Sequence, residues 1–259
     1  MKCLLVSDLH YTLKQLDWVD RVATAFDAVI MAGDHLDIAS AVDLEAQIVV
    51  MLKYLQRVGG RAKLLASSGN HDLNARGAHG EKVARWMARA RGFGIAVDGD
   101  SVEVGSTLFT VCPWWDGPET RKAVDEQLAR DAERPRQSWV WVYHSPPSDS
   151  PTSWTGTRHY GDDALVAWIE RYRPAMVFAG HIHQSPFRQG GSWVDRVGDT
   201  WIFNPGRQIG PVPTHVIVDT DAGHAMWFSL AGNEVCPLGA PLSRPLAEIG
   251  PDDDVRPLS

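Results

Sequence analysis

Short apolar runs alternate with longer amphipathic stretches over the first third of the chain. Three runs have the length and continuous hydrophobicity of strands buried on both faces of a sheet: 2–7, 28–32 and 63–67. The stretches that follow them have helical spacing and span 13–26, 41–58 and 81–91. Strands that alternate with helices in this way favour a parallel sheet with crossover helices.

The pattern changes after residue 100. Two short segments, 101–104 and 107–112, flank Gly105-Ser106 and predict a hairpin. Helices are expected at 119–133 and 162–172. The remaining strand patterns are 139–143, 175–179, 193–197, 201–204, 215–219 and 225–230, and we assign the last four to a second sheet or its edge.

Two sheets with helices outside them make an α/β fold, which we expect to be a four-layer α/β/β/α sandwich with two mixed sheets. This single domain is expected to cover residues 1–232. Residues 233–259, rich in Pro, Gly and Asp, are expected to form an extended C-terminal tail.

The composition narrows the class of protein. The 259 residues are 44% hydrophobic and 22% charged, as in ordinary soluble domains. The net charge of -7 argues against a general nucleic-acid-binding surface, so nucleic acid is expected only as a substrate. Three distant cysteines form no CxxC pair, which fits a reducing compartment. The first apolar run is too short for a signal peptide, and none can span a bilayer, so we expect a cytoplasmic protein.

Chemically active side chains follow five of the predicted strands. The segments are Asp8-Leu9-His10, Gly33-Asp34-His35-Leu36-Asp37, Gly69-Asn70-His71-Asp72, His144 and Gly180-His181-Ile182-His183. Each of these segments alone is common in loops, and a Gly-Asp or Gly-Asn pair more often forms a turn than contributes a metal ligand. His-x-His, however, places two imidazoles on one side of an extended segment. Because the C-terminal ends of parallel strands meet at one edge, the five segments together predict a metal site there.

In this order, the motifs Asp-x-His, Gly-Asp-x-x-Asp, Gly-Asn-His-Asp, His and Gly-His-x-His resemble those of the calcineurin-like metallophosphoesterase superfamily. The resemblance covers about residues 1–220, and the spacing is most similar to small bacterial phosphodiesterases that include the class III cyclic-nucleotide enzymes. The Asp-Arg-Gly extension of Ser/Thr protein phosphatases is absent, because Ile38 and Ala39 follow Asp37. The resemblance implies a metal-dependent phosphoric ester hydrolase, and first of all a phosphodiesterase with a small substrate.

The resemblance also implies the ligands of two divalent metal ions. Asp8, His10, Asp34 and His183 would hold one ion, and Asp34, Asn70, His144 and His181 the other. Such ligands suit Mn, Fe, Zn or Ni, with manganese our first expectation. A hydroxide bridging the ions would attack phosphorus in line with the leaving group. His71 would protonate the leaving alkoxide or contact the phosphate, and Asp37 would orient His71 and keep it cationic.

Substrate contacts are expected from the loops. Trp114 and Trp115 would either stack on a base or cap the edge of the core. Trp154 and His159 lie in a long loop that would either close over the site or stay solvated. His35 is expected to leave its loop on the side opposite the ligands and to lie behind them or face the substrate. Weaker candidates are Asn74, Arg76, His79 and Arg207.

Three alternatives stay open at this point. A nuclease of the same superfamily would need a basic groove, against which the net charge of -7 counts. A hydrolase of a pyrophosphate bond in a nucleotide or lipid precursor would use the tryptophan-bearing loops as an apolar lid. A scaffold that has lost catalysis would lack ligands, and none is missing here. The sequence leaves the oligomeric state, the natural substrate and the native metal pair open.

Overall fold

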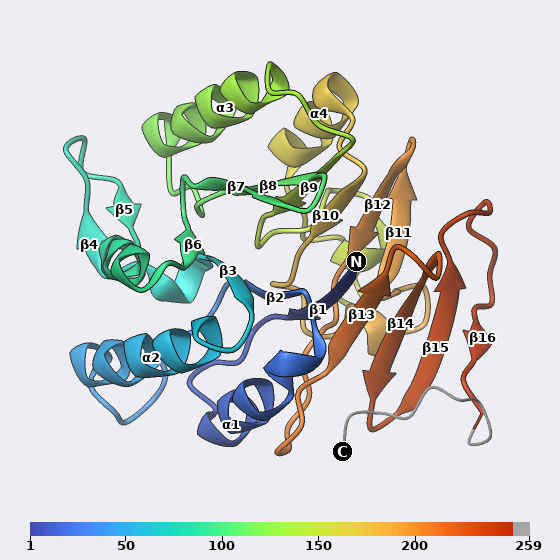
Figure 1. Cartoon of the computed structure of the whole chain (residues 1–259), viewed down its shortest axis with the longest axis horizontal. Helices are drawn as coiled ribbons and strands as arrows, with labels where there is room; N and C mark the ends of the chain where they lie inside the picture. The colour runs from blue at the N-terminus through green and yellow to red at the C-terminus, as the bar shows by residue number, and fades with distance from the viewer. Residues whose placement is uncertain (251–259) are drawn as a thin grey trace.

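Two β-sheets with helices on their outer faces form the core of the computed structural model, which describes residues 1–250 (Figure 1). The larger sheet has the strand order β16 (Ala247–Glu248), β15 (Gly232–Pro237), β14 (His224–Ser229), β13 (His215–Asp219), β1 (Lys2–Val6), β2 (Ala28–Ala32), β3 (Lys63–Ser67) and β6 (Ala96–Val97). The smaller sheet has the order β11 (Val194–Val197), β12 (Thr200–Phe203), β10 (Met176–Phe178), β9 (Ser138–Val142), β8 (Thr107–Val111) and β7 (Ser101–Val104).

The helices connect the parallel strands, as the alternating pattern predicts. They are α1 (Leu13–Val22), α2 (Leu44–Gly59), α3 (Pro118–Ala132) and α4 (Asp163–Tyr172). Short 3₁₀ helices are η1 (Ala23–Ala25), η2 (Asn70–Asp72), η3 (Arg85–Phe93), η4 (Pro151–Ser153) and η5 (Ser185–Phe187). None of the helices in residues 1–250 combines the length and the apolar character needed to cross a bilayer.

Both sheets are mixed. In the larger one β1, β2 and β3 run parallel, with Leu4 opposite Val29 and Val29 opposite Leu64, whereas β13 joins β1 antiparallel. In the smaller one β8, β9, β10 and β12 are parallel and the edge strands β7 and β11 are antiparallel. The predicted α/β class with two mixed sheets is therefore confirmed.

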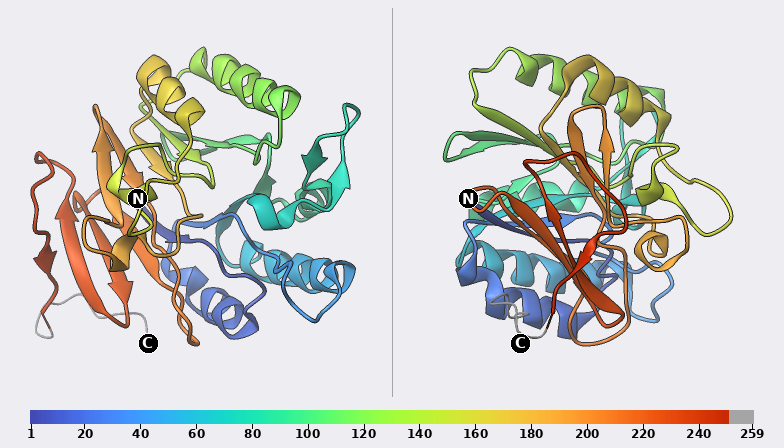
Figure 2. Two further views of the ribbon diagram at one scale, coloured as in Figure 1. Left: turned by 180° about the vertical axis from the view of Figure 1, so that it is seen from behind. Right: turned by 90° about the vertical axis from the view of Figure 1, so that its right-hand side faces the viewer.

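Three apolar clusters hold the elements together. One lies between α1, α2 and the larger sheet and includes Leu16 and Leu55, and another fills the space between the sheets around Ile30 and Phe178. The third packs the smaller sheet against α3 and α4 around Trp141. Figure 2 shows α3 and α4 along one side of the sheets and α1 and α2 along the other. The central strands read as continuous apolar runs because both their faces are covered.

Two expectations about these elements are wrong. The segment 81–91 is not a helix throughout: Val83 in β5 (Lys82–Val83) pairs with Ala75 in β4 (Ala75–Arg76) across a turn at Gly80, and only a 3₁₀ helix follows. The strands β13 and β14 belong to the first sheet, because Val218 pairs with Cys3 at its centre. Periodicity identifies a strand but not the neighbour with which it pairs.

The segment after residue 232 adds strands to the larger sheet. β15 pairs with β14 over its whole length, and β16 pairs with β15. Residues 232–237 and 247–248 are thus paired strands, although the division of the chain at residue 232 stays a prediction. The last part of the predicted tail, 251–259, lies outside the described residues.

Candidate metal centre

The predicted ligand residues come together where strands of both sheets end. They are Asp8 and His10 after β1, Asp34 after β2, Asn70 after β3, His144 after β9, and His181 and His183 after β10. Two overlapping groups have ligand atoms within 4.8 Å of one another: Asp8, His10, Asp34 and His183 in one, and Asp34, His144 and His181 in the other. Because Asp34 belongs to both groups, it lies where a bridging carboxylate is needed.

The two sheets contribute to the same contacts. His183 Nε2 lies 3.1 Å from Asp8 Oδ1 and 3.1 Å from His10 Nε2. On the other side, His144 Nε2 lies 3.3 Å from Asp34 Oδ2. The packing of the two sheets therefore assembles the centre, and neither sheet holds it alone.

The backbone at these positions is strained. Asp8, His10, Asp34 and His181 have φ values of 55°, 42°, 53° and 69°, in a region that residues with a side chain seldom adopt. Hydrogen bonds between the first two loops hold this shape: Asp8 N donates to the Gly33 carbonyl at 3.1 Å, and His10 N to the Asp34 carbonyl at 3.0 Å. Such strain persists only where the surroundings impose it, and it concentrates at functional sites.

Glycines leave room for the ligand side chains. A Cβ atom on Gly33 would lie 2.5 Å from Cγ of His144, and one on Gly69 would lie 2.6 Å from the backbone nitrogen of Asp34. A Cβ on Gly180 would lie 2.6 Å from Oδ2 of Asp8. Each glycine stands beside a ligand from another segment, so a larger residue there would displace that ligand.

The surroundings of the candidate ligands favour protonation states suited to metal binding. Burial opposes ionisation of Asp8 and is the largest single effect, but His183 and His144 together hold the pKa of Asp8 below its usual value. Burial lowers the pKa of His10 to about 4. Burial, with the charge of His144, lowers the pKa of His181 to about 4. These imidazoles are therefore neutral near pH 7, with a lone pair available.

His144 differs from the other imidazoles. Burial lowers its pKa, but Asp34 and Asp8 outweigh burial and raise it to about 9. Its Nδ1 lies 2.6 Å from the Ala32 carbonyl, which leaves Nε2 directed to the carboxylates. A divalent cation held between Nε2 and these carboxylates would compete with a proton for that nitrogen.

Two buried polar atoms make no hydrogen bond. Asn70 Oδ1 has no hydrogen-bond partner among residues 1–250, and His144 Nε2 only faces the Asp34 carboxylate at 3.3 Å. Buried polar atoms are nearly always paired, so unpaired ones need an explanation such as an ion. An amide oxygen and an imidazole nitrogen are both suitable ligands, and they complete the group around Asp34. The residues at this edge therefore fit a pair of divalent ions.

A family model described as the calcineurin-like phosphoesterase superfamily domain matches residues 1–223. The chain belongs to this family. Membership of this family, together with the clusters of candidate metal ligands, identifies the protein as a metal-dependent phosphoester hydrolase. A search of curated protein sequences finds no significant match.

Solved structures share the calcineurin-like fold. The protein TT1561 of Thermus thermophilus is 14% identical with a TM-score of 0.58, over 92% of this chain and 98% of that one. The purple acid phosphatase PPD1 from seeds of yellow lupin (Lupinus luteus) is 12% identical with a TM-score of 0.54, over 92% of this chain and 52% of that one. At these identities the likeness concerns the fold alone.

His71 lies beside the ligands of this calcineurin-like centre. Its ring centroid is 4.5 Å from that of His10, and its Nε2 is 4.0 Å from Asp34 Oδ2. Its backbone nitrogen donates to Asp34 Oδ1 at 2.9 Å, which fixes the residue next to the centre. Asp37 groups with His10 and His71 within 4.8 Å. The structure thus brings the predicted His71 and Asp37 together.

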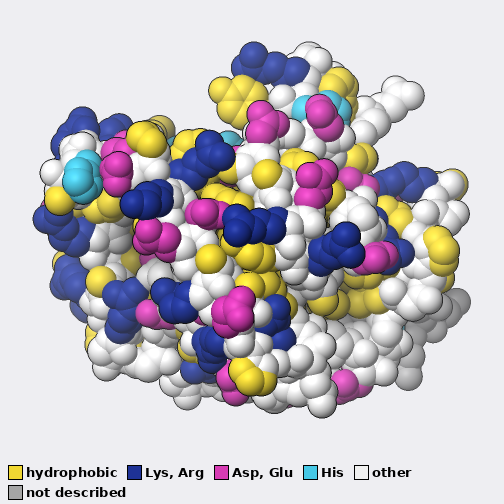
Figure 3. All heavy atoms as spheres, turned by 90° about the horizontal axis from the view of Figure 1, so that it is seen from above, with side chains coloured by type: hydrophobic (Ala, Val, Ile, Leu, Met, Phe, Trp, Pro, Cys, Tyr) yellow, Lys and Arg dark blue, Asp and Glu magenta, His cyan; other side chains and the backbone are white. Residues whose placement is uncertain are grey.

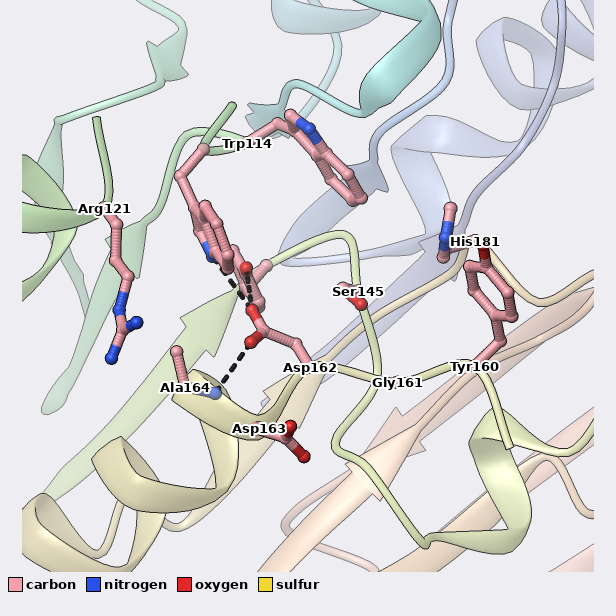
Figure 4. Close-up of a pocket in the computed structure, with 11 residues that line it drawn as sticks. Trp114, Arg121, Ser145, Tyr160, Gly161, Asp162, Asp163, Ala164 and His181 are labelled. Carbon is pink, nitrogen blue, oxygen red and sulfur yellow. Dashed lines mark hydrogen bonds between the residues drawn. The ribbon is translucent and has the colours of Figure 1, made fainter. Parts of the chain in front are cut away.

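Of the predicted substrate residues of the phosphoesterase, only some lie at a cavity beside the candidate ligands. Trp114 is 5.1 Å from His181 between ring centroids, and Trp114 and Trp115 line a cavity of about 370 Å³ beside the metal ligands (Figure 4). Trp154 and His159 pack on each other at 4.9 Å and do not line this cavity. Tyr160, which sequence reasoning missed, does line it, and an aromatic residue in the long loop was its only signal.

His35 does not reach a substrate. It faces away from the ligands, but it is 1% exposed and its Nε2 lies 2.8 Å from the Ser67 carbonyl. The backbone nitrogen of His35 donates to Asp72 Oδ1 at 3.0 Å, and Gly69 N donates to Asp72 Oδ2 at 2.8 Å. Asp72 thus connects the loop of His35 to the loop of Gly69, and the His35 ring lies in the core. The expectation that His35 faces the substrate is therefore corrected.

Proposed function

We propose that the protein is a phosphodiesterase that hydrolyses a P–O bond of a small phosphodiester with two divalent metal ions. The observation that carries the proposal is the pair of candidate ligand groups that share Asp34, beside which Asn70 Oδ1 is buried without a hydrogen-bond partner. One ion would be held by Asp8, His10, Asp34 and His183, and the other by Asp34, Asn70, His144 and His181. When bound, the ions would activate water and neutralise charge on the phosphate.

His71 would supply the proton for the leaving oxygen. It is next to the centre without belonging to either ligand group around Asp34. Asp37, close to it, would orient the imidazole toward the leaving oxygen. General acid catalysis of this kind contributes roughly 10²–10⁴-fold to the rate.

Arg207 would hold a phosphate oxygen. Its backbone nitrogen donates to the His183 carbonyl at 3.1 Å, so the residue is tied to a metal-ligand loop. Its charge helps to lower the pKa of His10, which places the guanidinium near the centre. The guanidinium makes no ion pair within residues 1–250 and therefore remains available for a phosphate oxygen.

The negative net charge favours a small substrate over a nucleic acid. On the face that carries α3 and α4, Figure 3 shows basic and acidic side chains interspersed rather than gathered in a basic stripe. All three cysteines are buried and form no disulfide, which supports the cytoplasmic location that we infer.

The decisive test begins with removal of metal and addition of Mn²⁺, our first choice among Mn, Fe, Zn and Ni. We expect bis(p-nitrophenyl) phosphate to be hydrolysed much faster than p-nitrophenyl phosphate. Asp34→Ala should abolish activity and metal binding, because Asp34 belongs to both ligand groups. The matched control is Asp199→Ala, at an aspartate whose side chain is 94% exposed. Unchanged hydrolysis by Asp34→Ala would contradict the proposal.

A further inference from the structure

A cavity opens directly beside the metal ligands. Its volume is about 370 Å³, within the range of roughly 300–1,000 Å³ that small-molecule sites occupy. His181 lines the cavity and also belongs to the ligand group of Asp34, so the two sites are continuous. In Figure 4, Trp114 and Tyr160 lie on two sides of the space in front of Ser145, and His181 lies beside Tyr160.

The tryptophan wall is held in place by hydrogen bonds that lead to two carboxylates. Trp114 N donates to Ser68 Oγ at 3.0 Å, and Ser68 N donates to Asp98 Oδ1 at 2.7 Å. Trp115 Nε1 donates to Asp162 Oδ2 at 3.0 Å. Asp162 also accepts from the backbone nitrogen of Ala164 at 2.7 Å, as the N-cap of α4. The wall is thus built before any ligand arrives.

The opposite wall comes from the loop before α4. Tyr160 N donates to the Ser153 carbonyl at 2.8 Å, and the Arg158 guanidinium lies 4.7 Å from the centroid of the Tyr160 ring. The next residue, Gly161, passes so close to Pro147 that a Cβ would lie 2.5 Å from its carbonyl carbon. Arg158 and the loop therefore hold the ring, although the Tyr160 side chain is 52% exposed.

We propose that this cavity binds a planar aromatic group attached to the scissile phosphate, and first of all a nucleobase, between Trp114 and Tyr160. The proposal rests on the proposed function, because a phosphate at the metal centre would position the attached group beside His181. Aromatic side chains on two walls suit a flat π-system, which stacks with them. An alkyl chain would instead desolvate Ser145 and Asp163, which also line the cavity.

Calorimetric titration of the Mn²⁺-loaded protein tests this without turnover. The probes are adenosine 5′-monophosphate against ribose 5-phosphate, which differ only in the base. We expect the nucleotide to bind about 10-fold more tightly, the lower part of the range for stacking on aromatic side chains. A second pair, phenyl phosphate and methyl phosphate, separates an aryl ester site from a nucleobase site. Equal affinities within both pairs would overturn the proposal, and a preference within the aryl pair alone would overturn the nucleobase assignment.

Matched variants test whether Tyr160 causes the preference for the nucleotide. Tyr160→Ala should remove the preference for the nucleotide while the affinity for ribose 5-phosphate stays unchanged, and Tyr160→Phe should retain the preference. Tyr54→Ala is the control, because Tyr54 also lies under an arginine, Arg57 at 5.2 Å, but on α2. A preference that survives Tyr160→Ala, or disappears equally in Tyr54→Ala, would contradict the assignment. A protein that binds the nucleotide but hydrolyses no diester would refute the proposed function and leave only the base-binding role of the cavity supported.

Discussion

The loops that carry the candidate metal ligands and the long loop 145–161 meet at His181, yet they are built in different ways. Asp8 and Asp34 are buried, have left-handed backbone conformations, and are locked by hydrogen bonds between neighbouring strand ends. Tyr160 is half exposed and held by contacts within its own loop. Changes in the first region must disturb several elements at once, whereas changes in the second affect one wall of a cavity.

Because of this difference, we expect one region to control the reaction and the other to control the choice of substrate. Ligand geometry depends on the packed strand ends of both sheets, which tolerate little movement. The cavity wall depends on a surface loop, and such loops accept substitution more readily. We therefore expect variants of the strand ends to lose metal and activity together, and variants of the loop to change the choice of substrate.

The largest expected effect comes from Gly33→Ala. The new Cβ would lie 2.5 Å from Cγ of His144, so His144 or the loop of Asp34 must move. We expect metal binding to be lost and hydrolysis to fall by more than about 100-fold, since proper orientation of metal ligands controls activity. Metal content by mass spectrometry and diester hydrolysis are the measurements.

Gly80→Ala is a matched control for this change. Gly80 has φ 85°, close to the 83° of Gly33, but no atom of another segment lies within 4 Å of the position that a Cβ would take there. Both variants carry the same backbone strain, of about 1 kcal/mol, and only Gly33→Ala carries the clash. If the two variants lost metal equally, backbone strain alone would explain the effect and the packing argument would be wrong.

The next effect concerns His71→Asn. Loss of the proton donor should lower kcat by roughly 10²–10⁴-fold for a diester with an alkyl leaving group. The loss should be smaller for a p-nitrophenyl diester, because p-nitrophenolate leaves without needing a proton. Metal content should stay unchanged, since His71 is outside the proposed ligand set.

The control for this variant is His224→Asn, at a half-buried histidine of β14. It should leave both rates unchanged. Equal losses for the alkyl and p-nitrophenyl diesters in His71→Asn would argue that His71 binds the phosphate rather than donating a proton.

The same contrast explains which features can be predicted from sequence. Each ligand loop follows a short apolar run, so its position at a strand end is a local property of the chain. Asp8, Asp34 and His183 are therefore predictable together, and the structure brings them within 4.8 Å. The strand register across the larger sheet, as between Val218 and Cys3, depends on contacts distant in sequence, which no local pattern reports.

Side-chain direction is harder to predict than position. His35 follows Asp34 in sequence, but its backbone nitrogen donates to Asp72 and its ring makes a hydrogen bond with the Ser67 carbonyl, so the ring lies in the core. Trp154 and Tyr160 are both aromatic residues of one loop, but Trp154 bridges to His159 and donates its Nε1 to the Gln189 carbonyl at 2.9 Å, and only Tyr160 of the two lines the cavity. No periodicity in the sequence reports such a bridge.

The smallest expected effect is a pH dependence of stability that arises away from both regions. His215 in β13 is buried, stacks on Phe228 at 5.0 Å, and lies 4.6 Å from Trp18 between ring centroids. Burial lowers its pKa from 6.5 to about 4, while its hydrogen bond with the Pro213 carbonyl acts in the opposite direction. The folded protein therefore keeps His215 neutral at a pH where the unfolded chain binds a proton.

The sign follows from this difference in proton binding. Above pH 6.5 neither state is protonated at His215, so its full contribution to stability is present. As the pH falls from 6.5 towards 4, the unfolded state gains the proton first, and the free energy of unfolding decreases by up to about 1.4 kcal/mol per pH unit. The measurement is urea unfolding at several pH values and matched metal content. His215→Gln should reduce the slope of the unfolding free energy against pH by the equivalent of up to one proton, whereas His224→Gln should leave it unchanged. A slope unchanged in His215→Gln would show that other buried groups, such as the imidazoles of the metal centre, account for the acid sensitivity.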